Sequence, residues 1–238
     1  MIKKLFEKYE TLICIVLIVV YVLVNSLCMQ SFGLGDYRST LINTLFSVIL
    51  LLLIASIKRF SYYGLAKVKD AKKYLYFIPL VFIASVNLWG GINTDKPTSE
   101  IIFYVLTMIN VGFLEEVIFR GFLFKMMEKD NLKVAIAVNS LTFGIGHVVN
   151  LLNGADPIPT LLQICYATAI GFLFVIIFYK SKSLVPCIIT HCLVNSLSVF
   201  AGENKILSYV TAAVLIVVPV VYALYILKKC GGLSECKE

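Results

Sequence analysis

The chain has 238 residues, of which 60% are hydrophobic and 15% are charged. A soluble domain carries about 25% charged residues, so this composition excludes an ordinary water-facing surface and is typical of a membrane-embedded chain. The net charge of +7 does not indicate nucleic acid binding, because the Lys and Arg residues flank apolar stretches, where they meet anionic membrane lipid.

Eight stretches are long and apolar enough for transmembrane helices, each of which needs about 20 residues. They cover residues 12–28, 41–57, 74–92, 101–124, 134–152, 160–179, 184–201 and 206–227. The first resembles a signal peptide, but no small-residue cleavage site follows it, so we expect a retained span. The sequence therefore predicts an all-α, polytopic membrane protein with one membrane-embedded domain over residues 1–238.

The basic residues between these stretches predict the orientation of the chain. If the N-terminus is cytoplasmic, 17 of the 21 Lys and Arg residues fall on the cytoplasmic side and three fall outside, while Arg120 lies within a span. This distribution follows the positive-inside rule at every loop. We therefore expect eight transmembrane helices with both termini in the cytoplasm.

Two connecting segments each have two interpretations. The basic segment 58–73 is either an amphipathic helix on the membrane surface, anchored by Tyr62, Tyr63 and Leu65, or a loop. The external tract 150–160 contains two prolines and is either a lid over an entrance or a plain connection.

A few polar side chains lie inside the predicted spans, where an ionisable group costs at least about 2.5–3.5 kcal/mol. They are Glu115, Glu116 and Arg120 in the fourth span, His147 in the fifth, and His191 and Asn195 in the seventh. Glu116 and Arg120 are four residues apart, so they share a helix face and can pair. At about 1.5 Å of rise per residue, the three helices present these groups at similar depths.

Each of these residues also has a plain structural explanation. Glu116 and Arg120 could form a structural ion pair, a single histidine could bond a backbone carbonyl, and Asn195 could join two helices. However, both histidines of the chain lie in spans at matched depth, near two adjacent glutamates. This combination favours one shared functional site.

Three short motifs, in this order and each in an apolar helix, are similar to those of a known family. They are Glu-Glu-x-x-x-Arg, Phe-x-x-x-His and His-x-x-x-Asn, which begin at Glu115, Phe143 and His191. The set resembles the CPBP family, the CAAX proteases and bacteriocin-processing enzymes that are also called the Abi family. The motif-bearing core spans residues 101–201. The resemblance implies an eight-span fold and hydrolysis of peptide bonds inside the membrane.

The resemblance also implies catalytic roles. Glu115 would be the general base that activates water, assisted by His147. His191 and Asn195 would stabilise the oxyanion of the tetrahedral intermediate. These residue types suit the chemistry, because a buried carboxylate can take a proton and because imidazole and amide N–H groups can donate to developing negative charge.

Glu116 and Arg120 would, by the same resemblance, hold Glu115 and shape the site. A metal is an open alternative, since Glu115, His147 and His191 are also a His₂Glu donor set of the kind that binds catalytic zinc. The family names include metalloprotease, a metal-free glutamate mechanism is also held for the family, and no HExxH motif is present. Taken together, these points slightly favour a site without a tightly bound metal.

The leading hypothesis is a glutamate-dependent intramembrane endopeptidase, similar to CAAX prenyl endopeptidases. Its substrates would be membrane-associated peptides or lipidated proteins, such as prenylated CAAX-type proteins, bacteriocins or signal peptides. Short loops and the lack of organelle signals fit a bacterial plasma membrane. Two alternatives stand beside it: a non-enzymatic bacteriocin-immunity or scaffold protein, and a transporter in which the glutamates and histidines relay protons or ions.

Overall fold

The computed structural model of the chain describes residues 2–68, 78–92, 95–202, 204–230 and 232–233. Within these residues the chain is built from helices and contains no β-strand. In chain order the helices are α1 (Ile2–Lys8), α2 (Glu10–Ser31), α3 (Tyr37–Ile57), α4 (Ile78–Ser85), η2 (Val86–Leu88), α5 (Thr98–Glu115), η3 (Glu116–Phe124), α6 (Lys125–Met127), α7 (Leu132–Gly146), α8 (Val149–Leu152), α9 (Pro157–Ser181), α10 (Val185–Leu197), η4 (Ser198–Phe200) and α11 (Lys205–Lys229). The predicted all-α class is confirmed.

Six helical stretches among the described residues are long and apolar enough to cross a membrane. They are α2, α3, α5 together with η3 and α6, α7 together with α8, α9, and α11. Apolar side chains on their outer faces, such as Leu12, Leu41 and Val221, are more than half exposed. Such a surface is suited to lipid rather than to water, and the chain is a multi-pass membrane protein.

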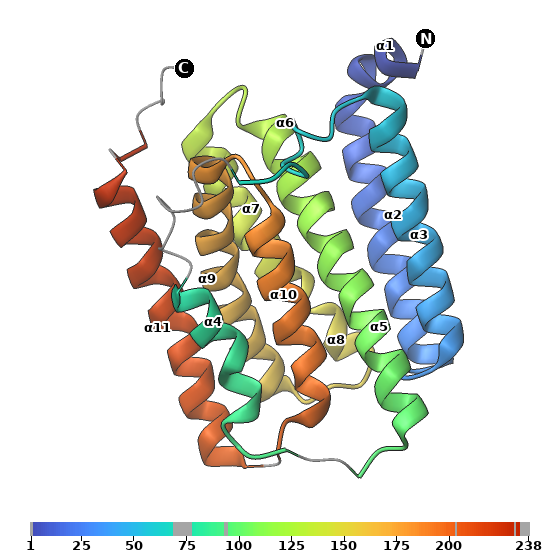
Figure 1. The fold of residues 1–238 in the computed structure, drawn as a ribbon, viewed down its shortest axis with the longest axis vertical. Coiled ribbons are helices and arrows are strands. Elements are labelled where there is room, and N and C mark those ends of the chain that lie inside the picture. The colour runs from blue at the N-terminus through green and yellow to red at the C-terminus, as the bar shows by residue number, and fades with distance from the viewer. Residues whose placement is uncertain (1, 69–77, 93–94, 203, 231, 234–238) are drawn as a thin grey trace.

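The remaining two predicted spans correspond to shorter apolar helices, Pro79–Leu88 and Val185–Phe200. Residues 74–77, where the third predicted span begins, lie outside the described residues. α1 and the end of α11 lie at the same end of the bundle (Figure 1), as an even number of crossings requires. The count of eight spans and the cytoplasmic location of the termini stay predictions.

Side-chain caps fix where several helices begin. The Asp36 carboxylate accepts from the backbone N–H of Arg38 at 2.8 Å at the start of α3. The side-chain oxygens of Asn131 and Asn204 each accept a backbone N–H at 3.1 Å at the starts of α7 and α11. These oxygens satisfy N–H groups that have no partner within the helix. Prolines in the first turns of α9 and α10 cost no backbone hydrogen bond there.

Small residues let the helices that carry the site approach closely. α5 packs against α3 and α10, and α9 packs against α7 and α11 (Figure 1). A Cβ atom at Gly112 of α5 would lie 2.9 Å from Cys192 Sγ on α10. One at Gly144 of α7 would lie 1.9 Å from Thr168 Oγ1 on α9. Glycine is therefore needed at both crossings, as is common between membrane helices.

The middle of the bundle contains an uncommon element, the π-helix η3, which continues α5 without a break. All nine of its residues are buried. π-helical turns widen the backbone spiral and are often found at functional sites. The predicted fourth span, residues 101–124, therefore exists, but its second part is π-helical rather than α-helical.

The segment after α3 forms turns rather than a surface helix. Residues 58–68 contain no helix, so the loop interpretation is confirmed for them, while residues 69–73 lie outside the described part. Tyr63 is fully buried, and its ring stacks on that of Phe122 with centroids 4.4 Å apart. This tyrosine packs within the protein and does not anchor the chain in lipid.

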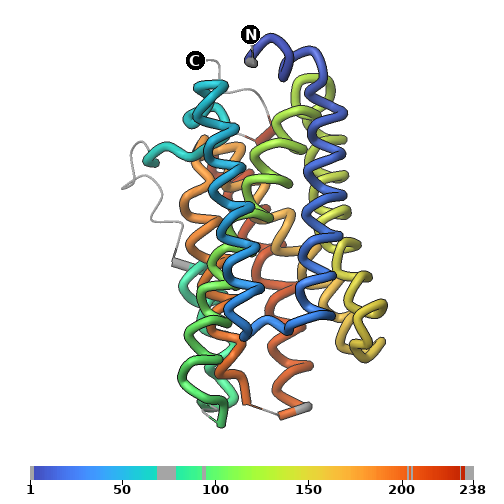
Figure 2. The backbone as a smooth tube through the Cα atoms, turned by 90° about the vertical axis from the view of Figure 1, so that its right-hand side faces the viewer, coloured from blue at the N-terminus to red at the C-terminus, as the bar shows by residue number. Residues whose placement is uncertain are grey.

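The tract 150–160 lies beside the end of α2, as Figure 2 shows in the side view of the bundle. The side-chain oxygen of Asn153 accepts hydrogen bonds from Ser26 Oγ at 2.8 Å and from Gln30 Nε2 at 2.7 Å. The tract is therefore fastened to α2 by side chains.

Candidate active site

Glu115, the last residue of α5, is held by a hydrogen-bond chain from α2. Its Oε1 accepts a hydrogen bond from the hydroxyl of Tyr21 at 2.6 Å. Asn25 Nδ2 in turn donates to the Tyr21 hydroxyl oxygen at 2.9 Å. Because Asn25 donates to the phenol, the phenol proton points at the carboxylate, and Oε1 of Glu115 is fixed in place.

Glu116, the first residue of η3, is completely buried, and its carboxylate has two nitrogen partners. Its Oε1 lies 3.1 Å from Arg120 Nη1 and 2.8 Å from His191 Nδ1. The Arg120 guanidinium also lies over the ring of Phe143, 3.8 Å from its centroid. A buried charge pair needs such additional partners to offset the loss of hydration. The predicted pairing of Glu116 with Arg120 is confirmed.

The His191 imidazole lies between the two glutamates. Its Nδ1 faces Glu116, and its Nε2 lies 3.5 Å from Oε2 of Glu115. Glu116 is paired with Arg120, so it is ionised and can only accept; we therefore assign the Nδ1 proton of His191 as the donor to it. The contact of Nε2 with Glu115 is longer than a good hydrogen bond, which leaves both atoms able to bind a third group.

His147 and Asn195 line the same cavity as Glu115 and His191. Within the described part of the chain, neither of them forms a side-chain hydrogen bond with Glu115 or His191. His147 directly follows α7, and its ring meets the ring of Phe143 edge-on with centroids 5.8 Å apart. Asn195 lies one turn after His191 on α10. The predicted grouping of the polar residues from three helices is therefore present in the structure.

The cavity beside these residues has a volume of about 400 Å³ and is walled mostly by α2, α5, α7, α9 and α10. Four of the six predicted site residues line it: Glu115, His147, His191 and Asn195. Glu116 and Arg120 are fully buried behind this wall. Asn150, Asn153 and Ala155 also line the cavity, so the tract 150–160 forms part of its wall.

A metal ion does not fit the donor set as it is arranged. No group of three or more His, Cys, Asp or Glu side chains within the described part of the chain is close enough to hold one. We derive no catalytic step through a metal.

The structure adds two residues that the sequence interpretation missed, Tyr21 and Asn25. They are four residues apart in a mostly apolar span, and this spacing of polar side chains could have indicated them. The structure also reassigns one contact: Glu116 holds His191, whereas the resemblance implied that it would hold Glu115.

Comparison with known proteins identifies the segment that carries the site. Residues 97–197 match the family described as type II CAAX prenyl endopeptidase Rce1-like. The match confirms the family resemblance of the three motifs, and it includes all six predicted site residues but neither Tyr21 nor Asn25. No curated protein and no solved structure gives a significant match to the chain.

Proposed function

We propose, from the family match and the site geometry, that the chain is a glutamate-dependent intramembrane endopeptidase of the CAAX prenyl endopeptidase type. One observation carries the proposal: two adjacent glutamates flank a single imidazole at the wall of a cavity of about 400 Å³. His147 and Asn195 line the same cavity. The set contains a carboxylate base and N–H donors, which are the groups that hydrolysis of a peptide bond requires.

Glu115 is the general base in this proposal. The Tyr21 hydroxyl holds Oε1, so Oε2 is the atom that takes a proton from water, assisted by His147. The water oxygen attacks the carbonyl carbon of the scissile peptide bond, and the carbonyl oxygen becomes the oxyanion. The C–N bond then breaks as the proton passes from Glu115 to the leaving amine, and the carboxylate is regenerated.

His191 and Asn195 stabilise the oxyanion. Because Glu116 occupies Nδ1 of His191, only Nε2 is available, and it must carry a proton to donate. His191 is then an imidazolium, whose charge is balanced by the carboxylates on either side of it. Together with Arg120, these four side chains are neutral overall. Losing one oxyanion donor costs roughly 10²–10³ in rate.

The substrates are peptides or lipidated proteins that reach the site within the membrane, with prenylated CAAX-type proteins, bacteriocins and signal peptides as candidates. The family description supports the prenylated class. The excess of basic residues in alternate loops supports eight spans with cytoplasmic termini. We place the protein in a bacterial plasma membrane, as a single domain.

The test is cleavage of quenched fluorescent peptides, with and without a prenyl group, by the full-length protein in liposomes. We expect Glu115→Gln to lower kcat by about 10²–10⁴, the range for loss of a general base. Glu100→Gln is the matched control, because Glu100 lies on the same helix and pairs with Lys96 at its far end. Normal cleavage by a folded Glu115→Gln variant would rule out the mechanism.

A further inference from the structure

The two ends of the bundle differ in charge. α3, α9 and α11 end at Lys58, Lys182 and Lys229, at the same end of the bundle as α1, which itself carries lysines (Figure 1). We call this the lysine-rich end. By the positive-inside rule it is the cytoplasmic end, in agreement with the orientation proposed above. The α2–α3 connection and the tract 150–160 lie toward the opposite end (Figure 2).

The catalytic cavity, which is the one of about 400 Å³ beside Glu115, reaches the end that lies away from the lysines. Leu34 of the α2–α3 connection and Ala155 of the connection before α9 both line it. Met29 near the end of α2 and Gly146 at the end of α7 also line it, and both are exposed. The cavity therefore opens at the end of the bundle opposite α1.

Toward the lysine-rich end, the cavity is closed by η3. This π-helix leads from Glu116 toward Lys125, and all nine of its residues are buried. Its apolar side chains belong to the same buried cluster as Tyr63 from the turns after α3. Within the described part of the chain, no residue of α1, of α6 or of the turns 58–68 lines the cavity. The lysine-rich end therefore offers no opening next to Glu115.

Neutral polar side chains line the open part of the cavity. They come from α2, α8, α9 and the connection after α8, and they are Asn25, Ser26, Asn150, Asn153 and Gln163. Asn150 Nδ2 donates to Gln163 Oε1 at 2.8 Å, and Ser26 Oγ donates to Asn153 Oδ1 at the same distance. Amide and hydroxyl groups of this kind exchange hydrogen bonds readily with water and with the peptide groups of a substrate.

We propose that the catalytic cavity opens at the outer face of the membrane, and that the substrates are peptide segments exposed on that face. The inference rests on the proposed protease function and on the proposed orientation. A prenylated protein that is anchored from the cytoplasm presents its C-terminus at the closed, lysine-rich end. An exported peptide, or the outer segment of a membrane-anchored precursor, presents its scissile bond at the open end. Among the candidate substrates, exported peptides therefore fit the cavity best.

The first experiment compares the two faces of the same membrane. The probe is a quenched fluorescent peptide that the detergent-solubilised full-length protein cleaves and that is too polar to cross a bilayer. Spheroplasts expose the outer face and should cleave the probe. Sealed inverted vesicles expose the cytoplasmic face and should not cleave it until detergent opens them. Glu115→Gln protein in both preparations measures the cleavage that is due to host proteases.

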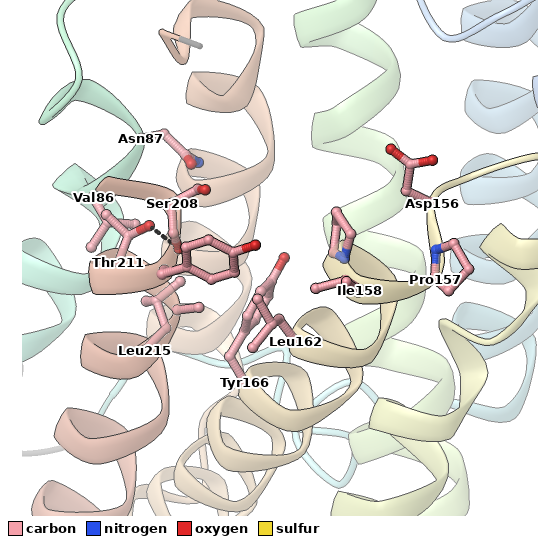
Figure 3. A pocket seen from close by; sticks show the side chains of 13 residues that line it. Val86, Asn87, Asp156, Pro157, Ile158, Leu162, Tyr166, Ser208, Thr211 and Leu215 are labelled. Atoms are coloured by element: carbon pink, nitrogen blue, oxygen red, sulfur yellow. Dashed lines mark hydrogen bonds between the residues drawn. The ribbon is translucent and has the colours of Figure 1, made fainter. Parts of the chain in front are cut away.

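The second experiment labels the mouth of the cavity, and its labelling step does not depend on activity. Ala155→Cys should react with a membrane-impermeant maleimide added to spheroplasts, and the attached label should then block cleavage. Asp156→Cys is the matched control, because Asp156 is exposed and lines a different pocket, of about 530 Å³, between η2, α9 and α11 (Figure 3). It should be labelled from the same face while cleavage continues. Lys182→Cys, at the lysine-rich end, should be labelled in inverted vesicles alone, with wild type correcting for native cysteines.

Cleavage by sealed inverted vesicles would overturn the proposed side of access and leave the protease proposal intact. Labelling of Ala155→Cys from the cytoplasmic face alone, or full cleavage by the labelled variant, would overturn it as well. If the solubilised protein cleaves no peptide, the protease proposal fails and the substrate assignment fails with it. The labelling result then still decides on which face the cavity opens.

Discussion

Tyr21→Phe is the sharpest test of how the site is assembled, because it removes a single oxygen atom. The Tyr21 hydroxyl donates to Glu115 Oε1 at 2.6 Å and is itself the acceptor for Asn25. The phenyl ring of the variant keeps its position against Phe46, whose ring centroid is 6.2 Å away. The change therefore releases the carboxylate without opening a large cavity.

The size of the effect follows from the kind of bond that is lost. A hydrogen bond to a charged group contributes about 1.5–3 kcal/mol, and about 1.4 kcal/mol corresponds to a factor of ten in rate. We therefore expect Tyr21→Phe to lower kcat/KM by roughly 10- to 100-fold. Asn25→Ala acts one bond further away and should lower kcat/KM by only a few fold.

The assay is peptide cleavage in liposomes, with thermal unfolding measured on the same samples. Tyr63→Phe is the matched control, because Tyr63 is also buried but does not line the catalytic cavity, and its activity should equal that of the wild type. A Tyr21→Phe variant with wild-type kcat/KM, alongside an inactive Glu115→Gln variant, would show that the base does not depend on the phenol.

Three further predictions concern the buried pair, the helix crossing and the metal. Glu116→Gln should lower the free energy of unfolding by about 3–5 kcal/mol, because Arg120 is left as an uncompensated buried charge. Changing both residues to Leu should restore stability but not activity. A Glu116→Gln variant that melts like the wild type would contradict this. Gly112→Leu should reduce kcat at least tenfold by separating α5 from α10. Adding Cys192→Ala should restore part of the lost activity, since the two residues meet at the crossing. An unchanged kcat in Gly112→Leu would mean that the crossing tolerates a larger side chain. Treatment with a chelator should change the cleavage rate by less than about twofold, as expected for a base that acts without a metal, and a loss that zinc reverses would refute the metal-free mechanism.

The positions of the six motif residues could be predicted because each signal is local. Spans can be recognised from length and composition, and polar residues within them are few enough to count. The pairing of Glu116 with Arg120 also follows from local spacing, and it holds although the backbone there is π-helical. Nothing in the residue types from Glu116 to Phe124 distinguishes a π-helix from an α-helix, so that element could not be predicted.

The partners of these residues could not be predicted, because they depend on contacts between distant parts of the chain. Tyr21 and Glu115 are 94 residues apart, and Glu116 and His191 are 75 apart. Helical periodicity places a side chain on a face but does not say which helix lies opposite. The family resemblance likewise assigned Glu116 to Glu115, and only the packing of α5 against α10 shows that His191 is its partner.

The two adjacent glutamates have different surroundings, and the proposed mechanism gives them different roles. Successive residues of a helix point about 100° apart, so Glu115 and Glu116 point in different directions. Glu115 lines it and is held by one phenol, which leaves an oxygen for chemistry. Glu116 is fully buried, and its carboxylate is bound by Arg120 and His191. Exchanging their roles would require a rotation of the helix by one residue, which would carry Glu116 away from His191 on α10. The order of the pair, rather than its composition, therefore determines which glutamate lines the cavity and is the proposed base.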